Sequence, residues 1–204
     1  MISPATFALF LTTSALLVVI PGPNHLYITA RGLSQGRVAG LVSALGVEIG
    51  TLVHIAAAAA GLSYVIARSA TLYTVIKWAG VAYLVYLGIR AFTGRQGAAG
   101  RPEPQPLRKV FLEGVLVNVF NPKTLLFFLA LLPQFVRPES GSPALQVVVF
   151  GCTLLLLGLI SDIVYALTAG ALGRRLDRAA RSLRYVSGVV YLGLGVFTAF
   201  TGRQ

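Results

Sequence analysis

Long apolar runs separated by short polar stretches make up most of the chain. The runs long enough to cross the roughly 30 Å of bilayer hydrocarbon lie at 6–30, 38–67, 72–90, 110–136, 144–172 and 183–201. Hydrophobic residues account for 56% of the 204 positions and charged residues for 11%. Charge is therefore too sparse to coat a soluble protein. The pattern predicts an all-α integral membrane protein with six transmembrane helices.

The distribution of basic residues predicts an orientation in the membrane. A net charge of +11 would suggest nucleic-acid binding in a soluble protein, but here Lys and Arg stand between apolar runs, so no nucleic-acid partner is expected. The odd-numbered connections hold twelve of them, whereas the even-numbered connections and the carboxyl-terminal tail together hold four. Cytoplasmic loops carry the excess of Lys and Arg. We therefore expect the odd connections in the cytoplasm and both termini outside.

A stretch rich in Gly, Pro and Gln divides the chain. Residues 94–109 carry these residues together with basic ones, which is typical of a flexible linker. We expect a basic cytoplasmic linker at 94–109 between a first three-helix repeat at 1–93 and a second at 110–204, within a single transmembrane domain. The first apolar run has no basic region before it and no small-residue cleavage pattern, so it is predicted to be a retained helix.

The first predicted span is interrupted. It reads VIPGPNHLYI at 19–28, so Pro21, Gly22 and Pro23 precede a polar residue, Asn24, inside an apolar run. Proline removes a backbone donor and clashes with the preceding helical turn. A break in the helix is predicted here.

A weak internal repeat gives this break a counterpart. A shift of 99 positions aligns 22–35 with 121–134 and places Asn121, Pro122 and Lys123 inside the fourth span. Each half has three spans, so the second copy must insert in the opposite orientation. Two inverted three-helix repeats with interrupted first helices are typical of secondary transporters, whose sites form where helices are broken. Tolerated kinks are the alternative, but their recurrence at corresponding positions favours function.

Four ionisable residues lie well inside apolar spans: Glu48, His54, Lys123 and Asp162. Each charge costs about 2.5–3.5 kcal/mol at the centre of a membrane helix, so such residues usually serve a function. Lys123 at the second break either binds a substrate carboxylate or compensates Asp162 or Glu48. The two acids are candidates for proton coupling. His54 is more often a satisfied core histidine than a ligand.

Two further patterns concern helix contacts. Small residues recur at four-residue spacing, as in Gly46 and Gly50, which lets helices approach closely within the bundle or across a homodimer. Glu113 follows Lys109 by four residues, which predicts a salt bridge at a helix start.

No pattern for soluble-type catalysis occurs. The chain has one cysteine, Cys152, no Walker glycine loop, no nucleophile beside a base and no Cys/His metal spacing. We therefore expect no enzyme activity, no metal site and no cofactor. Transport would have to draw on an ion gradient or a partner.

Three blocks, in this order, carry a family resemblance: PGPNHLYITARGLSQGRVAGLVSALGVEIGTLVHIAAAAAGL, KWAGVAYLVYLGIRA and GVLVNVFNPKTLLFFLALLPQFV. With them the chain resembles the LysE/RhtB family of bacterial amino-acid exporters over essentially its full length. The resemblance implies export of amino acids or closely related small metabolites from the cytoplasm across the bacterial inner membrane, driven by proton exchange.

The resemblance also implies a site. The family's motif positions, taken as substrate-binding, are Pro21, Gly22, Pro23, Asn24, Asn121, Pro122 and Lys123. Asp162 matches an acid often present in the fifth span and is taken, with Glu48, as proton-coupling. Glu48 and His54 fall at variable positions, so any role of theirs bears on substrate choice. The alternatives are a non-transporting scaffold with a structural pair of Lys123 and Asp162, or an exporter of another solute or a metal ion.

Overall fold

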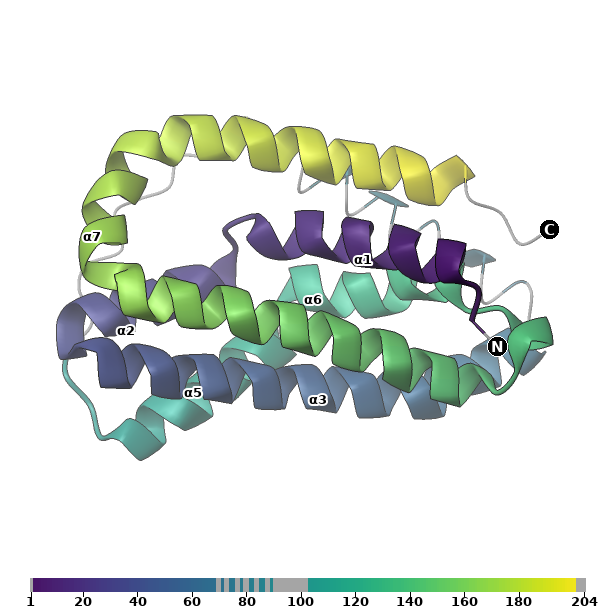
Figure 1. Ribbon diagram of the computed structural model, residues 1–204, viewed down its shortest axis with the longest axis horizontal. Helices are drawn as coiled ribbons and strands as arrows, with labels where there is room; N and C mark the ends of the chain where they lie inside the picture. Colours follow the sequence, from purple (N-terminus) through teal and green to yellow (C-terminus); the bar gives the residue numbers. More distant parts are fainter. Residues whose placement is uncertain are drawn as a thin grey trace.

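The computed structural model describes the backbone of residues 2–68 and 103–200, with isolated positions between 71 and 89. The predicted third span and residues 94–102 of the predicted linker lie largely or wholly outside the described residues. Every regular element in the described part is helical, as the all-α prediction requires (Figure 1). The α-helices are α1 (Pro4–Val19), α2 (Pro23–Gln35), α3 (Arg37–Arg68), α5 (Leu107–Val119), α6 (Pro122–Leu126) and α7 (Pro143–Phe200).

Two helices are long and apolar enough to cross a membrane unaided: α3 over Arg37–Gly61 and α7 over Pro143–Ala169. Two further spans form if each bent pair of helices is taken as one. α1 and α2 meet at 46°, and α5 meets the segment Lys123–Phe135 at 45°. The described part of the chain therefore holds two to four candidate spans, and the two that are bent are the ones whose interruption the sequence predicted.

The prolines at the breaks begin new helices. Pro23 starts α2 after Gly22, and Pro122 starts α6 after Asn121. Proline suits the first position of a helix because its missing N–H would have no helical partner there. The Asn121 side chain accepts a hydrogen bond from the Lys123 backbone N–H at 2.9 Å, which satisfies one of the free donors of the new helix.

The helical character changes after α6. The chain passes through a π-helix at Phe127–Leu131 and a 3-10 helix at Leu132–Phe135, then a short 3-10 turn at Pro138–Ser140. The second broken span is therefore less regular than the first, in which α1 is an α-helix throughout.

The two broken spans run in opposite directions along the long axis of the molecule (Figure 1). α7, predicted as two separate helices, is assigned as one helix from Pro143 to Phe200. Figure 1 shows that its ribbon bends sharply, so that its second arm returns along the first. The start of α1 and the end of α7 consequently lie towards the same end of the molecule.

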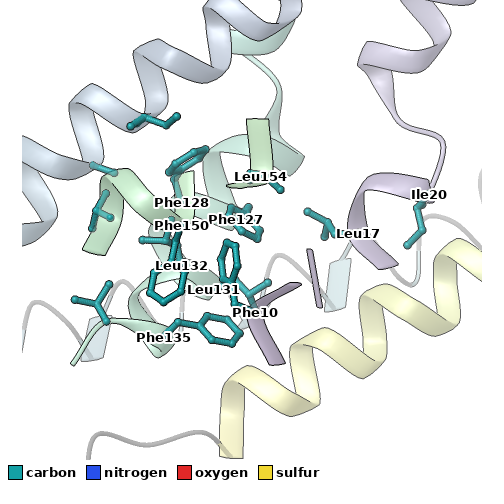
Figure 2. Packing of buried hydrophobic residues seen from close by; sticks show 14 residues of the cluster. Phe10, Leu17, Ile20, Phe127, Phe128, Leu131, Leu132, Phe135, Phe150 and Leu154 are labelled. Atoms are coloured by element: carbon teal, nitrogen blue, oxygen red, sulfur yellow. The ribbon is translucent and has the colours of Figure 1, made fainter. Parts of the chain in front are cut away.

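An aromatic core joins α1, the first arm of the first broken span, to Lys123–Phe135, the second arm of the second broken span (Figure 2). The ring of Phe10 on α1 contacts Phe127, Phe135 and Phe150, at centroid distances of 5.9, 5.2 and 4.5 Å. Edge-on and offset ring pairs of this kind add to the stabilisation from burial alone. α1 is thereby packed against the second broken span and against α7.

Glycines allow α3 and α5 to cross closely. A Cβ atom on Gly46 would lie 2.2 Å from the backbone oxygen of Phe111, and one on Gly114 would lie 2.7 Å from that of Ser43. Gly50 faces Asn118 in the same way. Of the two uses left open for these small residues, close packing inside the chain is the one observed here.

Candidate functional site

A cavity lies between the two helix breaks. About 510 Å³ there is not filled by protein atoms, and part of this space is open to solvent. The residues that line it come from both broken spans, α3 and α7: Leu17, Val18, Gly22, Asn24, His25, Glu48, Thr51, Asn121, Lys123, Thr124, Phe127, Leu154, Gly158 and Asp162. The cavity thus combines an apolar lining with one ammonium and two carboxyl groups.

Lys123 joins the two breaks. Its Nζ donates a hydrogen bond of 2.8 Å to the main-chain carbonyl of Ile20, where α1 has ended and the carbonyl has no helical partner. The lysine side chain runs along Gly22, where a Cβ atom would lie 3.3 Å from its Cδ. Glycine at this position therefore leaves room for the lysine to reach the carbonyl.

A network of side-chain amides connects the same two breaks. Asn121 donates to Asn24 at 2.8 Å, and Asn24 donates to the side-chain oxygen of Asn118 at 3.0 Å. That oxygen also accepts from Thr124, while the Asn118 amide donates to Thr51 on α3. Asn118 is fully buried and fully hydrogen-bonded, as a buried polar group must be.

Two carboxyl groups face each other across α3 and α7. Glu48 on α3 and Asp162 on α7 line the same cavity and are near enough for each to act on the charge of the other. Both acids are buried. Two neighbouring carboxylates repel each other, so the pair favours a state in which at least one carries a proton. Among the described residues, Glu48 Oε2 has no hydrogen-bond partner, so an acceptor atom stays free.

His25 lies between the first break and Asp162. Its Nδ1 accepts a hydrogen bond from the Gly22 backbone N–H at 3.2 Å, and its Nε2 is 3.4 Å from Asp162 Oδ1. Ser161 Oγ is 3.3 Å from the same nitrogen. The ring also packs on Tyr165, with centroids 4.2 Å apart.

Lys123 and Asp162 line one cavity but form no direct ion pair in the described part of the chain. The ammonium is held by the Ile20 carbonyl instead. A purely structural pair would bring the two charges into contact, because only close geometry offsets the cost of removing both from water. The arrangement therefore argues against the scaffold alternative.

His54 has the environment of a core histidine. Its Nε2 donates to the Asn118 backbone oxygen at 3.1 Å, and its ring stacks on Phe128 with centroids 5.6 Å apart. It does not line the cavity. Among the described residues, no group of three or more His, Cys, Asp or Glu is placed to hold a metal ion.

A second polar cluster lies where α2 packs against the start of α5. Arg31, which is buried, donates to Glu113 at 2.7 Å and to the Glu103 backbone oxygen at 2.9 Å. Tyr27 donates to the same Glu113 oxygen at 3.2 Å. The predicted pairing of Glu113 with Lys109 is therefore wrong: α2 packs against α5, and its buried Arg31 is the ion-pair partner of Glu113.

The structure brings most of the predicted site residues together, but not all in the same way. Gly22, Asn24, Asn121 and Lys123 line the cavity, as do Glu48 and Asp162. Pro21 and Pro23 do not line it, and Pro122 contributes the start of α6. The prolines thus shape the breaks while their neighbours face the cavity.

Sequence reasoning overlooked the residues that link these groups. Asn118 stands three positions before Asn121, and Thr51 stands three after Glu48. The second spacing places Glu48 and Thr51 on one face of α3, so a search for polar neighbours at this spacing would have found Thr51; Asn118 and Asn121 lie on the two sides of the second break. His25, next to Asn24, has one local contact, with Gly22, but its contacts with Asp162, Ser161 and Tyr165 come from α7 and could not be read from the sequence.

Comparison with known proteins identifies a family and several relatives. A family model described as LysE type translocator matches residues 15–202. A membrane protein of Vibrio cholerae is 31% identical over 93% of this chain and 94% of its own length. The membrane protein YrhP of Bacillus subtilis is 29% identical, over 94% of this chain and 97% of its own length.

One relative has a name that states a function. The homoserine/homoserine lactone efflux protein of Salmonella typhimurium is 30% identical over 78% of each chain. No solved structure matches the chain. The helical spans and these relatives make it a multi-pass membrane protein, and the family match makes it a transporter and not an enzyme. With a family model that covers nearly its whole length, the chain belongs to the LysE type translocator family.

Proposed function

We propose that this translocator exports amino acids or closely related small metabolites from the bacterial cytoplasm across the inner membrane, in exchange for protons. The observation that supports the proposal most is the shared cavity. It offers an ammonium from Lys123 and a carboxyl pair from Glu48 and Asp162, next to a row of amide side chains. A small zwitterion carries the complementary charges.

Lys123 is the proposed site for the substrate carboxylate. Its ammonium now donates to a neutral carbonyl, that of Ile20, and a carboxylate is the stronger acceptor because the bond is then charged on both sides. The substrate ammonium would meet the side-chain oxygens of Asn24 and Asn121 or carbonyls left free at the breaks. Homoserine is the first substrate to test, since a relative is named for its efflux.

Asp162, together with Glu48, is the proposed carrier of the coupling proton. Both acids line the substrate cavity, so a change in their protonation alters the charge that a bound zwitterion meets. With both acids ionised the cavity holds two negative groups, and with a proton on each it holds none. Proton exchange at this pair would therefore change the affinity for the substrate.

The two broken spans are proposed to be corresponding parts of an inverted repeat, with 1–93 and 110–204 as its halves and 94–109 as a cytoplasmic linker. Their opposite directions in Figure 1 and their matched bends of 46° and 45° support this. Rocking of one half against the other would expose the cavity alternately to each side. The proposed orientation has both termini in the periplasm.

The experiment uses purified protein in liposomes loaded with radiolabelled homoserine and, separately, each common amino acid. Acidifying the outside should accelerate efflux of at least one of them. The Asp162→Asn variant should lose this acceleration, whereas Glu139→Gln, an exposed acid outside the cavity, should keep it. A complete panel without efflux would refute the proposal, and an unchanged pH response in Asp162→Asn would remove Asp162 from it.

The double variant Lys123→Met with Asp162→Leu separates transport from a scaffold role. Apolar residues often replace a structural ion pair without loss of folding, but they cannot bind a zwitterion. We expect a folded, monodisperse protein with no efflux. A homodimer, which the small-residue spacing left open, would be visible in the same size-exclusion runs.

A further inference from the structure

We propose that His25 is a positioning residue that links the coupling carboxyl of Asp162 to the broken first span. The inference rests on the proposed function for its meaning in transport. Its structural basis is the pair of contacts that the ring makes: Nδ1 with the Gly22 backbone N–H at 3.2 Å, and Nε2 with Asp162 Oδ1 at 3.4 Å.

The first contact determines the tautomer of the ring. A backbone N–H can only donate, so Nδ1 must accept and carries no proton. A neutral imidazole has one proton, which then resides on Nε2. Nε2 therefore donates, and its acceptor is Asp162 Oδ1 or, at 3.3 Å, Ser161 Oγ. The break in the first span thus sets which ring nitrogen faces α7.

The same geometry extends to the proposed substrate site. Gly22, whose N–H the ring holds, lies against the side chain of Lys123. Contacts therefore run without interruption from Asp162 through His25 and Gly22 to Lys123. A change in the protonation of Asp162 can therefore affect the position of Lys123, which lines the same cavity and is proposed to bind the substrate carboxylate.

The groups around His25 are consistent with this role. Asp162 and Tyr165 face it from α7, Lys123 acts on it from α6, and the Ile20 backbone carbonyl acts on it at the end of α1. Glu48 on α3 reaches it through Asp162. The other histidine, His54, contacts a backbone carbonyl and a phenyl ring, so it provides an internal comparison within the same chain.

The first test needs no substrate. The chain has only two histidines, so protein labelled with ¹⁵N-histidine in lipid nanodiscs gives two imidazoles, and the signals lost in His25→Gln belong to His25. We expect Nδ1 without a proton and Nε2 with one, and an Nε2 signal that moves in Asp162→Asn but stays in Ser161→Ala. A proton on Nδ1, or a response to Ser161→Ala alone, would overturn the inference.

The contact between the ring and the Gly22 N–H can be observed separately. Pro21–Gly22 is the only Pro-Gly pair in the sequence, so labelling proline carbonyls with ¹³C and glycine nitrogens with ¹⁵N selects the Gly22 amide. In His25→Leu this amide should shift as it loses its acceptor. The amide should keep its position in His54→Leu. An unmoved Gly22 signal in the first variant would contradict the proposal.

Two conservative variants then separate the contacts in transport. His25→Asn places an acceptor near Nδ1 but has no donor near Nε2, whereas His25→Gln places a donor near Nε2. The pH at which homoserine efflux is half-maximal should change in His25→Asn, with about a tenfold change in rate at a fixed pH, the size expected for a bond to a charged group. His25→Gln should keep the profile of the unmodified protein, and equal profiles for the two variants would overturn the role. If the unmodified protein moves no substrate, the proposed function fails, while the labelling results still decide the placement of His25.

Discussion

The ammonium of Lys123 donates to the backbone carbonyl of Ile20, 103 positions earlier in the chain, at 2.8 Å. The contact exists because both spans are broken: one break leaves the carbonyl without a partner, and the other places a lysine at the start of a new helix. A charged donor on a neutral carbonyl is a bond that a carboxylate can replace. The Ile20 carbonyl therefore holds the Lys123 ammonium in position, and a substrate carboxylate can take the place of that carbonyl.

Replacing Lys123 tests whether its ammonium binds the substrate carboxylate. Lys123→Met should reduce efflux by tenfold or more, because a hydrogen bond to a charged group is worth about 1.5–3 kcal/mol and each 1.4 kcal/mol is a factor of ten. Lys123→Arg retains the charge and should retain part of the activity at a higher KM. Efflux from liposomes measures both variants. Full activity of Lys123→Met would exclude a substrate contact at this position.

The carboxyl pair predicts a graded response to substitution. Glu48→Gln leaves Asp162 able to ionise but removes the second acid of the cavity. We expect Glu48→Gln to keep efflux, with a rate that responds over a narrower range of external pH than in the unmodified protein. Asp162→Asn should remove the response to pH. The measurement is the initial efflux rate across a series of external pH values. Identical profiles for the two variants would show that the acids do not act in different roles.

The close crossing of α3 and α5 predicts a site of high sensitivity. Gly46→Ala would place a methyl group 2.2 Å from the Phe111 backbone oxygen, and overpacking of this kind typically costs about 1–3 kcal/mol. Gly61→Ala is the matched control, because nothing lies within 4 Å of its Cβ position. Thermal unfolding in detergent should show a lower Tm for Gly46→Ala only. A similar Tm for both would mean that α3 and α5 are not in contact as described.

The buried pair of Arg31 and Glu113 should matter more than an exposed one. Glu113→Gln leaves a buried guanidinium without its counter-charge, and breaking such a pair costs about 3–5 kcal/mol; because Glu113 is 30% exposed, we expect the lower end. The control is Glu139→Gln, whose partner Arg137 is 61% exposed and whose loss should change stability by less than about 1 kcal/mol. Denaturant or thermal unfolding compares them. Equal effects would contradict the burial of Arg31.

Asn118 provides a further comparison of buried and exposed polar groups. Asn118→Ala removes the hub that joins Asn24, Thr51 and Thr124 and leaves their polar atoms unpaired, at about 1–3 kcal/mol for each buried group. Thr153→Val, an exposed hydroxyl bonded only to its own helix, should be nearly neutral. We expect a clear loss of Tm and of efflux in the first variant and neither in the second. If Asn118→Ala changes neither Tm nor efflux, Asn118 is not the residue that connects the two breaks.

The linear pattern of residues was enough to predict the all-helical character, the two breaks and the polar groups at them. These properties are local: an apolar run long enough to cross the bilayer becomes helical because its backbone must satisfy its own hydrogen bonds, and proline ends that pattern wherever it stands. The bends at Gly22 and Asn121 follow from their neighbours in sequence. So does the inference that Lys123 and Asp162 serve a purpose at membrane depth.

Contacts between distant segments depended on the tertiary structure. The partner of Lys123 is a carbonyl and not Asp162, Glu113 binds Arg31 and not Lys109, and His25 faces α7. Each of these follows from how the helices pack, including the glycine crossing of α3 and α5. A one-dimensional pattern shows which side chains need partners, but packing in three dimensions determines which partner is near enough to provide one.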